Sequence, residues 1–167
     1  MRGSSAKSLD VVLSAVSAAQ GPSSELGSQL FSAVSVLDAS PALRRVVTDP
    51  STETAAKSGL VAQVFGQQVS ADVLTVLQAA AAGRWAAGRD LTDGLEAAGV
   101  AALIKSAEQN GSLDVVETEL FSAGEVIRSD VELRRIISDK SVAHSAKAAL
   151  LKDVFGGKID DTTLAIV

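Results

Sequence analysis

The sequence predicts an all-α protein made of two tandem six-helix-bundle-type domains. Alanine is its most frequent residue, and only 3% of the chain is aromatic. Alanine favours helices, whereas strands favour β-branched and aromatic side chains. Apolar residues also recur at helical spacing along the chain. The third observation is an internal repeat, which sets the domain organisation.

The sequence repeats itself at an offset of 90 residues. Residues 30–77 align with 120–167 without a gap, and 17 of the 48 pairs are identical. The clearest pair is LRRVVTDPSTETAAKSGLVAQVFG and LRRIISDKSVAHSAKAALLKDVFG. Such a match indicates duplication. We therefore expect domains at 1–94 and 95–167. Because the chain ends in TTLAIV inside an apolar helical pattern, we expect the second copy to be truncated before its fifth and sixth helices are complete.

The first copy is expected to hold five helices before its last one. Apolar stripes predict helices at about 5–20 (Leu9, Val12, Leu13 and Val16) and 23–39 (Leu26, Leu30, Val34 and Leu37). Ser40-Pro41 is typical of a helix start and precedes the short helix ALRRVV. A fourth helix follows Ser51 or Thr52, ends at Gly66 and is expected to bury Ala56, Leu60 and Val64. The fifth spans about 70–82.

A shared helix is expected to join the two copies. After a break at Gly83–Trp85, the chain has no proline, so we expect one long helix near 87–109. The second copy then repeats the series, with helices at about 113–129, 130–138, 142–155 and from 160 onward.

No combination of residues indicates an active site. The chain has no cysteine, and its one histidine, His144, corresponds to Thr54 in the first copy, so we expect a surface residue. The stretch Gly156-Gly157-Lys158 lacks the GxxxxGK[ST] pattern of a phosphate loop and is expected to be a turn. We expect no catalytic residue, no cofactor and no metal. The net charge of −5 argues against nucleic acid as a partner, and no apolar run is long enough for membrane insertion.

A few conspicuous side chains have two interpretations each. The pairs Arg44-Arg45 and Arg134-Arg135 either stabilise short helices and reach Asp49 or Asp139, or form a charged rim for a protein partner. Trp85 either packs at the junction of the copies or is an exposed anchor. The repeated phenylalanines are expected in the cores: Phe31, Phe121, Phe65 and Phe155.

The second copy resembles the N-terminal domain of the ATP synthase delta subunit, the bacterial counterpart of the mitochondrial oligomycin sensitivity-conferring protein. Its stretch from Ser129 is similar to the family pattern NPELRxxLxxPxxxxxxKxxLLxxLFGGKxSxxxxxFL. The matching residues are Leu133, Arg134, Lys147, Leu150, Leu151, Phe155, Gly156, Gly157 and Lys158. The pattern ALFxxAxExGxLDxVxxEL is matched by Ala102, Leu103, Ala107, Gly111, Leu113 and Glu119. Gly99 replaces a common aromatic residue, and the duplication resembles the actinobacterial form.

The resemblance implies a mechanical function. The family's N-terminal domain is a six-helix bundle on the catalytic head, where its first and fifth helices grip the N-terminal helix of an alpha subunit. A C-terminal domain, absent here, joins the b subunits. The resemblance therefore implies a non-catalytic stator subunit fragment that resists rotor torque during ATP synthesis and hydrogen-ion transport. Its implied location is peripheral, at the cytoplasmic face of the cell membrane.

Two apolar grooves are expected to receive such helices, since a groove between helices can hold an amphipathic helix. In the first copy the expected residues are Val12, Leu13, Val16, Leu74 and Leu77. In the second they are Leu103, Ile104, Ala107, Leu164 and Val167. Several alternatives stay open. The same residues can be core, the first copy can be a spacer, and the parent protein can be a b–delta fusion. The chain can also be a generic helical-bundle adaptor unrelated to ATP synthase, or a small helical enzyme or carrier.

Overall fold

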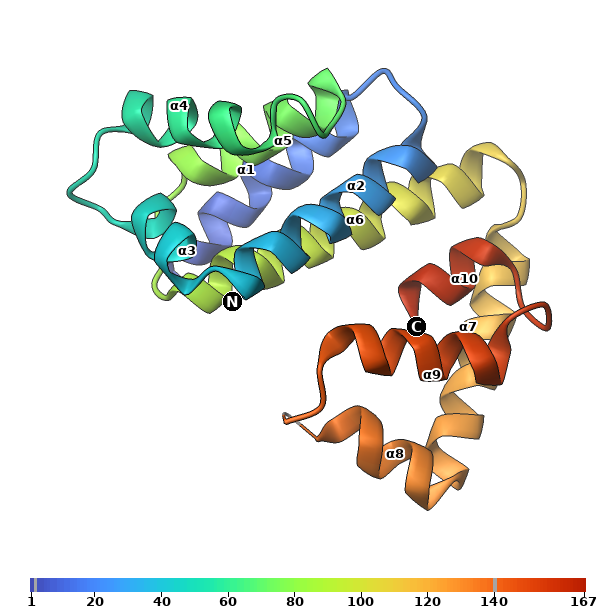
Figure 1. The fold of residues 1–167 in the computed structure, drawn as a ribbon. Helices are drawn as coiled ribbons and strands as arrows, with labels where there is room; N and C mark the ends of the chain where they lie inside the picture. Colours follow the sequence, from blue (N-terminus) through green and yellow to red (C-terminus); the bar gives the residue numbers. More distant parts are fainter. Residues whose placement is uncertain (2, 140) are drawn as a thin grey trace. The chain divides into compact units, whose positions relative to one another are not determined.

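The computed structural model describes residues 1, 3–139 and 141–167, without the side chain of His144, so the expectation for that side chain lies outside the described residues. Throughout these ranges the regular structure is helical, with ten helices and no strand (Figure 1). This confirms the predicted all-α class. The helices are α1 (Ser4–Ala18), α2 (Ser23–Ala39), α3 (Pro41–Thr48), α4 (Thr54–Phe65), α5 (Ala71–Ala82), α6 (Gly88–Gln109), α7 (Leu113–Ser129), α8 (Val131–Ser138), α9 (His144–Phe155) and α10 (Asp161–Ile166).

The chain divides into two compact units, Met1–Ser106 (unit 1) and Ala107–Val167 (unit 2). The division falls inside α6, which is the long helix predicted near 87–109. Both bounds of α7, α8 and α9 lie 90 residues after those of α2, α3 and α4. The helix order of unit 2 therefore follows the offset of the sequence repeat, while the division at 94/95 stays a prediction.

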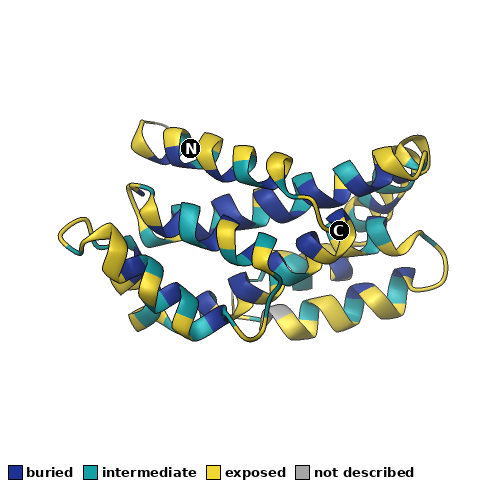
Figure 2. Cartoon of the chain, turned by 90° about the horizontal axis from the view of Figure 1, so that it is seen from above, coloured by how far each residue is buried: buried dark blue, intermediate teal, exposed yellow. Residues whose placement is uncertain are grey.

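Unit 1 has a continuous apolar core to which all six of its helices contribute. In Figure 2, buried positions alternate with exposed ones along the helices, as amphipathic helices require. The stripe of α2 is buried as predicted, and Ser40 begins α3 by accepting a hydrogen bond from the Leu43 N–H. The stripe predicted for α4 was wrong by one position. Its buried residues are Lys57, Val61 and Phe65, because this face is the one directed at the core.

Two glycines allow α2 and α6 to cross closely. A Cβ atom at Gly27 would lie 2.8 Å from Leu103 Cγ and 2.9 Å from the Gly99 carbonyl oxygen. A Cβ atom at Gly99 would lie 2.8 Å from the Phe31 ring. Gly99, where the resemblance led one to expect an aromatic residue, thus makes room for an aromatic ring from the neighbouring helix.

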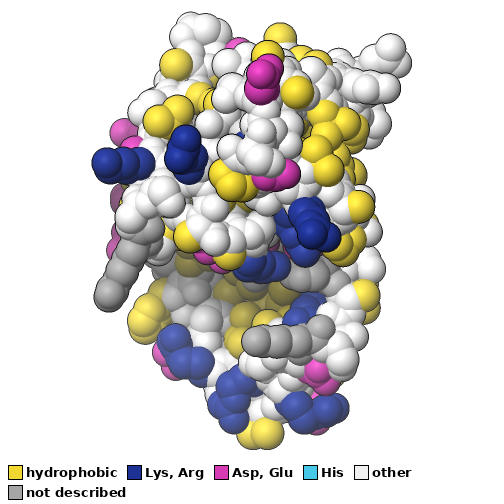
Figure 3. Space-filling model, turned by 90° about the vertical axis from the view of Figure 1, so that its left-hand side faces the viewer, with side chains coloured by type: hydrophobic (Ala, Val, Ile, Leu, Met, Phe, Trp, Pro, Cys, Tyr) yellow, Lys and Arg dark blue, Asp and Glu magenta, His cyan; other side chains and the backbone are white. Residues whose placement is uncertain are grey.

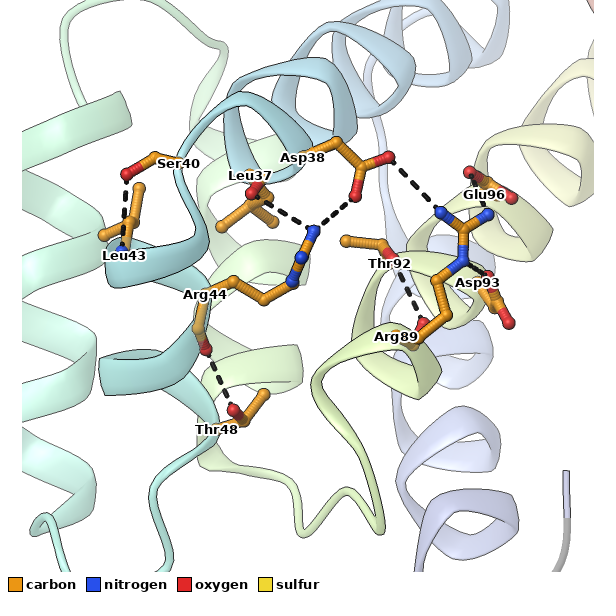
Figure 4. Close-up of polar contacts among 10 residues, drawn as sticks. All are labelled: Leu37, Asp38, Ser40, Leu43, Arg44, Thr48, Arg89, Thr92, Asp93 and Glu96. Atoms are coloured by element: carbon orange, nitrogen blue, oxygen red, sulfur yellow. Dashed lines mark hydrogen bonds and ion pairs between the residues drawn. The ribbon is translucent and has the colours of Figure 1, made fainter. Parts of the chain in front are cut away.

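A charged cluster joins α2, α3 and α6 in unit 1. Asp38 lies between Arg44, at 2.6 Å, and Arg89, at 3.5 Å (Figure 4). Arg89 also pairs with Asp93 at 2.6 Å and lies 3.7 Å from Glu96. Burial disfavours the charge of Arg89, but the nearby carboxylates together raise its pKa. The interpretation that Arg44 reaches Asp49 was wrong, because Asp38 is the carboxylate within its reach.

The aromatic side chains show which positions the two units bury. Phe65 and Phe155 are buried, as predicted. Phe121 is 68% exposed, so its prediction as a core residue was wrong: in unit 1 the Phe31 ring packs on Gly99, whereas Phe121 on α7 has no such cover. Trp85 is buried in the core of unit 1 and donates its indole N–H to the Ala80 carbonyl at 2.8 Å, which excludes the exposed anchor.

Unit 2 has a smaller core in which α7, α9 and α10 meet. Ala123, Leu151 and Phe155 form its buried centre. Glu119 on α7 binds the start of α10, since one carboxylate oxygen accepts from the Asp160 N–H at 2.9 Å and from the Thr163 hydroxyl at 2.6 Å. These two bonds tie the start of α10 to α7 where the core is small.

The surface carries both signs of charge and also apolar side chains. On the face shown in Figure 3, Lys and Arg, Asp and Glu, and hydrophobic side chains are all exposed. Among the described residues, no helix is both long enough and apolar enough to cross a bilayer.

Candidate partner-binding groove

An open groove of about 570 Å³ lies between α1 and α5 of unit 1. Its lining is mostly apolar or small, with two cationic side chains: Gly3, Ser4, Lys7, Ser8, Val11, Ala79, Ala82, Gly83 and Arg84. Val11 is 57% exposed and lines the groove together with the alanines of α5. The groove therefore presents an apolar surface that the fold of unit 1 leaves uncovered.

The sequence places this surface on the outer side of two amphipathic helices. On α1, Ser4, Lys7 and Val11 recur at helical spacing, while Val12 and Val16 are buried on the adjacent face. On α5, Ala79 and Ala82 have no side chain beyond Cβ, so the groove stays open above them. A hydrophobic residue opposite a strip of alanines is suited to receive the apolar face of another helix.

The end of the groove is fixed by hydrogen bonds between α1 and the loop after α5. The Ser8 hydroxyl accepts from the Arg84 N–H at 2.8 Å and donates to the Arg84 carbonyl at 2.9 Å. The Ser5 hydroxyl accepts from the Ala86 N–H at 2.9 Å and donates to Asp90 at 2.5 Å. Both serines are buried. These bonds satisfy loop groups that the core would otherwise leave unpaired.

Glycine is required at this contact. A Cβ atom at Gly83 would lie 2.8 Å from the Ser8 hydroxyl oxygen and 2.9 Å from Ser8 Cβ. A larger residue would therefore push the loop away from α1. The turn at Gly83-Arg84 is thus part of the groove wall.

The charge of the groove is positive. Lys7 and Arg84 are its charged lining residues, and neither Asp nor Glu lines it. The lining offers hydroxyls and cations but no pairing of a nucleophile with a base, so its arrangement suits binding rather than covalent chemistry. An apolar helix with negative charge near one end would complement it.

The residues predicted for the first groove lie on the core side of the same two helices. Val12, Val16 and Leu77 are buried in the core of unit 1. Leu13 and Leu74 are half-buried and pack against that core. The structure thus brings all five together, but none of them lines the groove between α1 and α5.

The residues predicted for the second groove are divided between the two units. Leu103 and Ala107 are buried, whereas Ile104 is exposed on α6. Leu164 and Val167 are half-buried and pack against the core of unit 2. Whether any of them contacts a partner stays a prediction.

Sequence reasoning missed Val11, Ala79 and Ala82. It selected the most apolar stripe of each helix, and that stripe forms the core. The available signal was the second apolar position of the pair Val11-Val12, together with the run of four alanines from Ala79 to Ala82. A valine outside the main stripe indicates a second apolar face.

The chain is similar to proteins that share one name, ATP synthase subunit delta. The sequence profile described as ATP synthase delta (OSCP) subunit matches residues 100–167. Three proteins named ATP synthase subunit delta are similar to more of this chain than residues 100–167. The protein of Rhodococcus opacus is 37% identical over 149 residues, or 89% of this chain and 54% of the relative. That of Streptomyces griseus is 36% identical over 86% of this chain and 53% of the relative.

The third relative extends the match almost to the full chain. The protein of Kineococcus radiotolerans is 37% identical over 158 residues, which cover 95% of this chain and 56% of the relative. The chain therefore spans about half the length of the relatives it matches. Because the alignments include unit 1 as well as unit 2, the similarity extends beyond the part that the profile matches.

Proposed function

We propose that the chain, whose residues 100–167 match the profile described as ATP synthase delta (OSCP) subunit, is part of a non-catalytic stator subunit of a bacterial ATP synthase. In this proposal its helical units hold N-terminal helices of alpha subunits. The b subunits bind through a further domain of the parent protein. The complex places the chain at the cytoplasmic face of the cell membrane, where it links the catalytic head to the peripheral stalk.

The observation that carries the proposal is the groove between α1 and α5. The resemblance assigns alpha-subunit binding to the first and fifth helices of such a domain, and in unit 1 these two helices bound an uncovered apolar groove. Unit 1 is the copy for which a spacer was the alternative. An open, mostly apolar groove between these two helices favours a bound helix over a spacer, because such a groove can receive the apolar face of a helix whereas a spacer does not require one.

Binding without catalysis is consistent with the physical demands on a stator. It must resist torque, so it needs a large apolar contact and a rigid fold rather than reactive groups. Two linked units could each bind one helix. The second binding event would then be intramolecular, which would raise the overall affinity, provided that the geometry allows both contacts at once. A generic helical adaptor would also bind without catalysing a reaction. The experiment below distinguishes such an adaptor from the proposed stator subunit.

Calorimetric titration with a synthetic N-terminal peptide of the alpha subunit from the same genome tests the proposal. We expect saturable binding that Val11→Glu weakens about tenfold or more, because a carboxylate would be buried in an apolar contact. Val36→Glu is the matched control, since Val36 is an exposed valine on α2 outside the groove. Absence of binding by the unaltered chain, or equal affinity of the Val11→Glu variant, would refute the proposal for unit 1.

A further inference from the structure

A second pocket adjoins the groove at the end held by Ser8 and Arg84. Its volume is about 240 Å³, and its lining residues are Ser4, Thr48, Pro50, Lys57, Gly83, Arg84 and Trp85. It shares Ser4, Gly83 and Arg84 with the groove. The groove and the pocket therefore border on the same three residues.

The pocket contains a lysine whose ammonium group has no partner among the described residues. Lys57 as a whole is only 5% exposed, yet within the described chain its ammonium group forms neither a hydrogen bond nor an ion pair. Since no fully buried side-chain nitrogen of the described residues lacks a partner, this ammonium group keeps contact with solvent through the pocket. Its counterpart in the repeat, Lys147, donates to the Ile137 carbonyl at 2.7 Å. The lysine of unit 2 is thus satisfied internally, whereas that of unit 1 is available to a ligand.

Asp49 does not neutralise Lys57 by contact. Asp49 interacts with it only electrostatically, and one carboxylate oxygen of Asp49 accepts from the Ser51 hydroxyl and N–H at 2.7 and 2.8 Å. These bonds are the main cause of the lowered pKa of Asp49, to which Lys57 adds a smaller attraction. The carboxylate of Asp49 is thus already engaged in its own turn.

Two other features of the pocket also favour an anion. Arg84 forms no ion pair with the described residues, and its backbone is fixed by Ser8. The N-terminus of α1 begins at Ser4 and has no side-chain cap, so its first N–H groups are available to an acceptor. Two cations and the positive end of a helix dipole therefore converge on one small cavity.

We propose that this pocket binds a carboxylate group of an acidic side chain near one end of the helix that occupies the groove. The inference rests on the proposed function, to which it adds the chemistry of the partner: an apolar face for Val11 and the alanines, and a carboxylate for Lys57 and Arg84. A salt bridge in this pocket would fix the axial register of the helix, since an apolar groove alone lets a helix slide.

Trp85 provides a direct reporter, because it is the only tryptophan of the chain and lines the pocket. The alpha-subunit peptide is compared with a form in which every Asp and Glu is replaced by Asn and Gln. Affinity is measured by calorimetry, and occupation of the pocket is followed by Trp85 fluorescence. We expect the acidic peptide to bind about tenfold or more tightly, with a change in Trp85 emission, and the preference to vanish in Lys57→Met and Arg84→Gln variants.

The controls separate the pocket from general charge effects. Arg45→Gln removes an exposed arginine outside the pocket and is expected to keep the preference. If Lys57→Met fails to fold, which its circular dichroism reveals, the exposed side chain of Arg84 still allows the test. Equal affinity for both peptides, or a preference that survives in Arg84→Gln, overturns the inference while leaving the groove intact.

If neither peptide binds, the proposed function fails and the pocket is tested with acetate alone. Acetate and chloride are then compared at equal ionic strength. A change in Trp85 emission that is specific to acetate and absent from Lys57→Met supports a carboxylate site. No such change overturns it.

Discussion

Ser8 and Arg84 exchange two hydrogen bonds through a single hydroxyl, which accepts from the Arg84 N–H at 2.8 Å and donates to its carbonyl at 2.9 Å. The two residues lie on α1 and on the loop after α5, so this contact sets the distance between the walls of the groove. It also places Arg84 where the groove meets the cationic pocket. A buried serine thus shapes both the groove and the pocket beside it.

Replacing Ser8 with alanine is expected to lower the free energy of unfolding by about 1–3 kcal/mol, because the Arg84 N–H and carbonyl lose their partner in a partly buried site. Thermal unfolding followed by circular dichroism measures the change. Ser14→Ala is the matched control, since the Ser14 hydroxyl only bonds back to the Asp10 carbonyl on the exposed side of α1. A Ser8→Ala variant as stable as this control would show that the loop does not depend on Ser8.

Gly27→Ala is expected to destabilise unit 1 by about 1–3 kcal/mol, because the new methyl group would overlap Leu103 and the Gly99 carbonyl where α2 crosses α6. Gly59→Ala is a control for which the free energy of unfolding is expected to change in the opposite direction. Gly59 is an exposed position within α4 with no atom near the added Cβ, so alanine is expected to stabilise by about 0.5–1 kcal/mol. Urea unfolding of the two variants distinguishes them. Equal effects would contradict the close crossing.

Asp38→Asn is expected to cost about 1–2 kcal/mol, because it leaves Arg44 without its carboxylate in a partly buried site and weakens the link to Arg89. High salt should reduce this loss of stability less than it reduces the loss at an exposed ion pair, because partly buried charges are screened less. Glu132→Gln is the control: its pair with Arg135 is exposed and is expected to contribute little. If both variants unfold alike across salt concentrations, Asp38 does not join the three helices.

Much of the fold could be predicted from the sequence. Where the prediction succeeded, the apolar spacing and the capping residues of a helix match the face that the helix buries in the core. The apolar stripe of α2 and the Ser40-Pro41 start of α3 are local features, and both appear as expected. The burial of Phe121 failed because it depends on a neighbouring helix rather than on α7 itself. The stripe of α4 failed since Lys57 is buried, and a lysine is normally assigned to the surface.

The site was harder to predict than the fold. A groove does lie between the two helices that carry the expected residues, but Val12 and Leu77 are core, whereas Val11 and the alanines line the groove. An apolar residue signals burial without saying whether the chain itself or a partner covers it. Alanines leave a groove open because they have no side-chain atoms beyond Cβ, and a hydropathy pattern does not show this. The burial of Lys57 required the packing of α4 to be known.

Acid titration tests a feature that both copies share. Asp49 and Asp139 each accept from the side chain and N–H of the serine two residues on, at 2.6–2.8 Å, and these bonds are the main cause of their lowered pKa values. A carboxylate with a lowered folded pKa stabilises the fold above its unfolded pKa, near 3.8. This stabilisation disappears as the pH falls through the folded value.

The double variant Asp49→Asn, Asp139→Asn should therefore melt below the unaltered chain at pH 7, and the gap should close as the pH falls below about 4. Melting temperatures between pH 3 and pH 7 measure this. Glu53→Gln with Glu117→Gln removes two exposed carboxylates outside these turns and controls for net charge. A gap that stays constant down to pH 3 would mean that the turns are held by geometry alone, because charge would then make no difference to their stability.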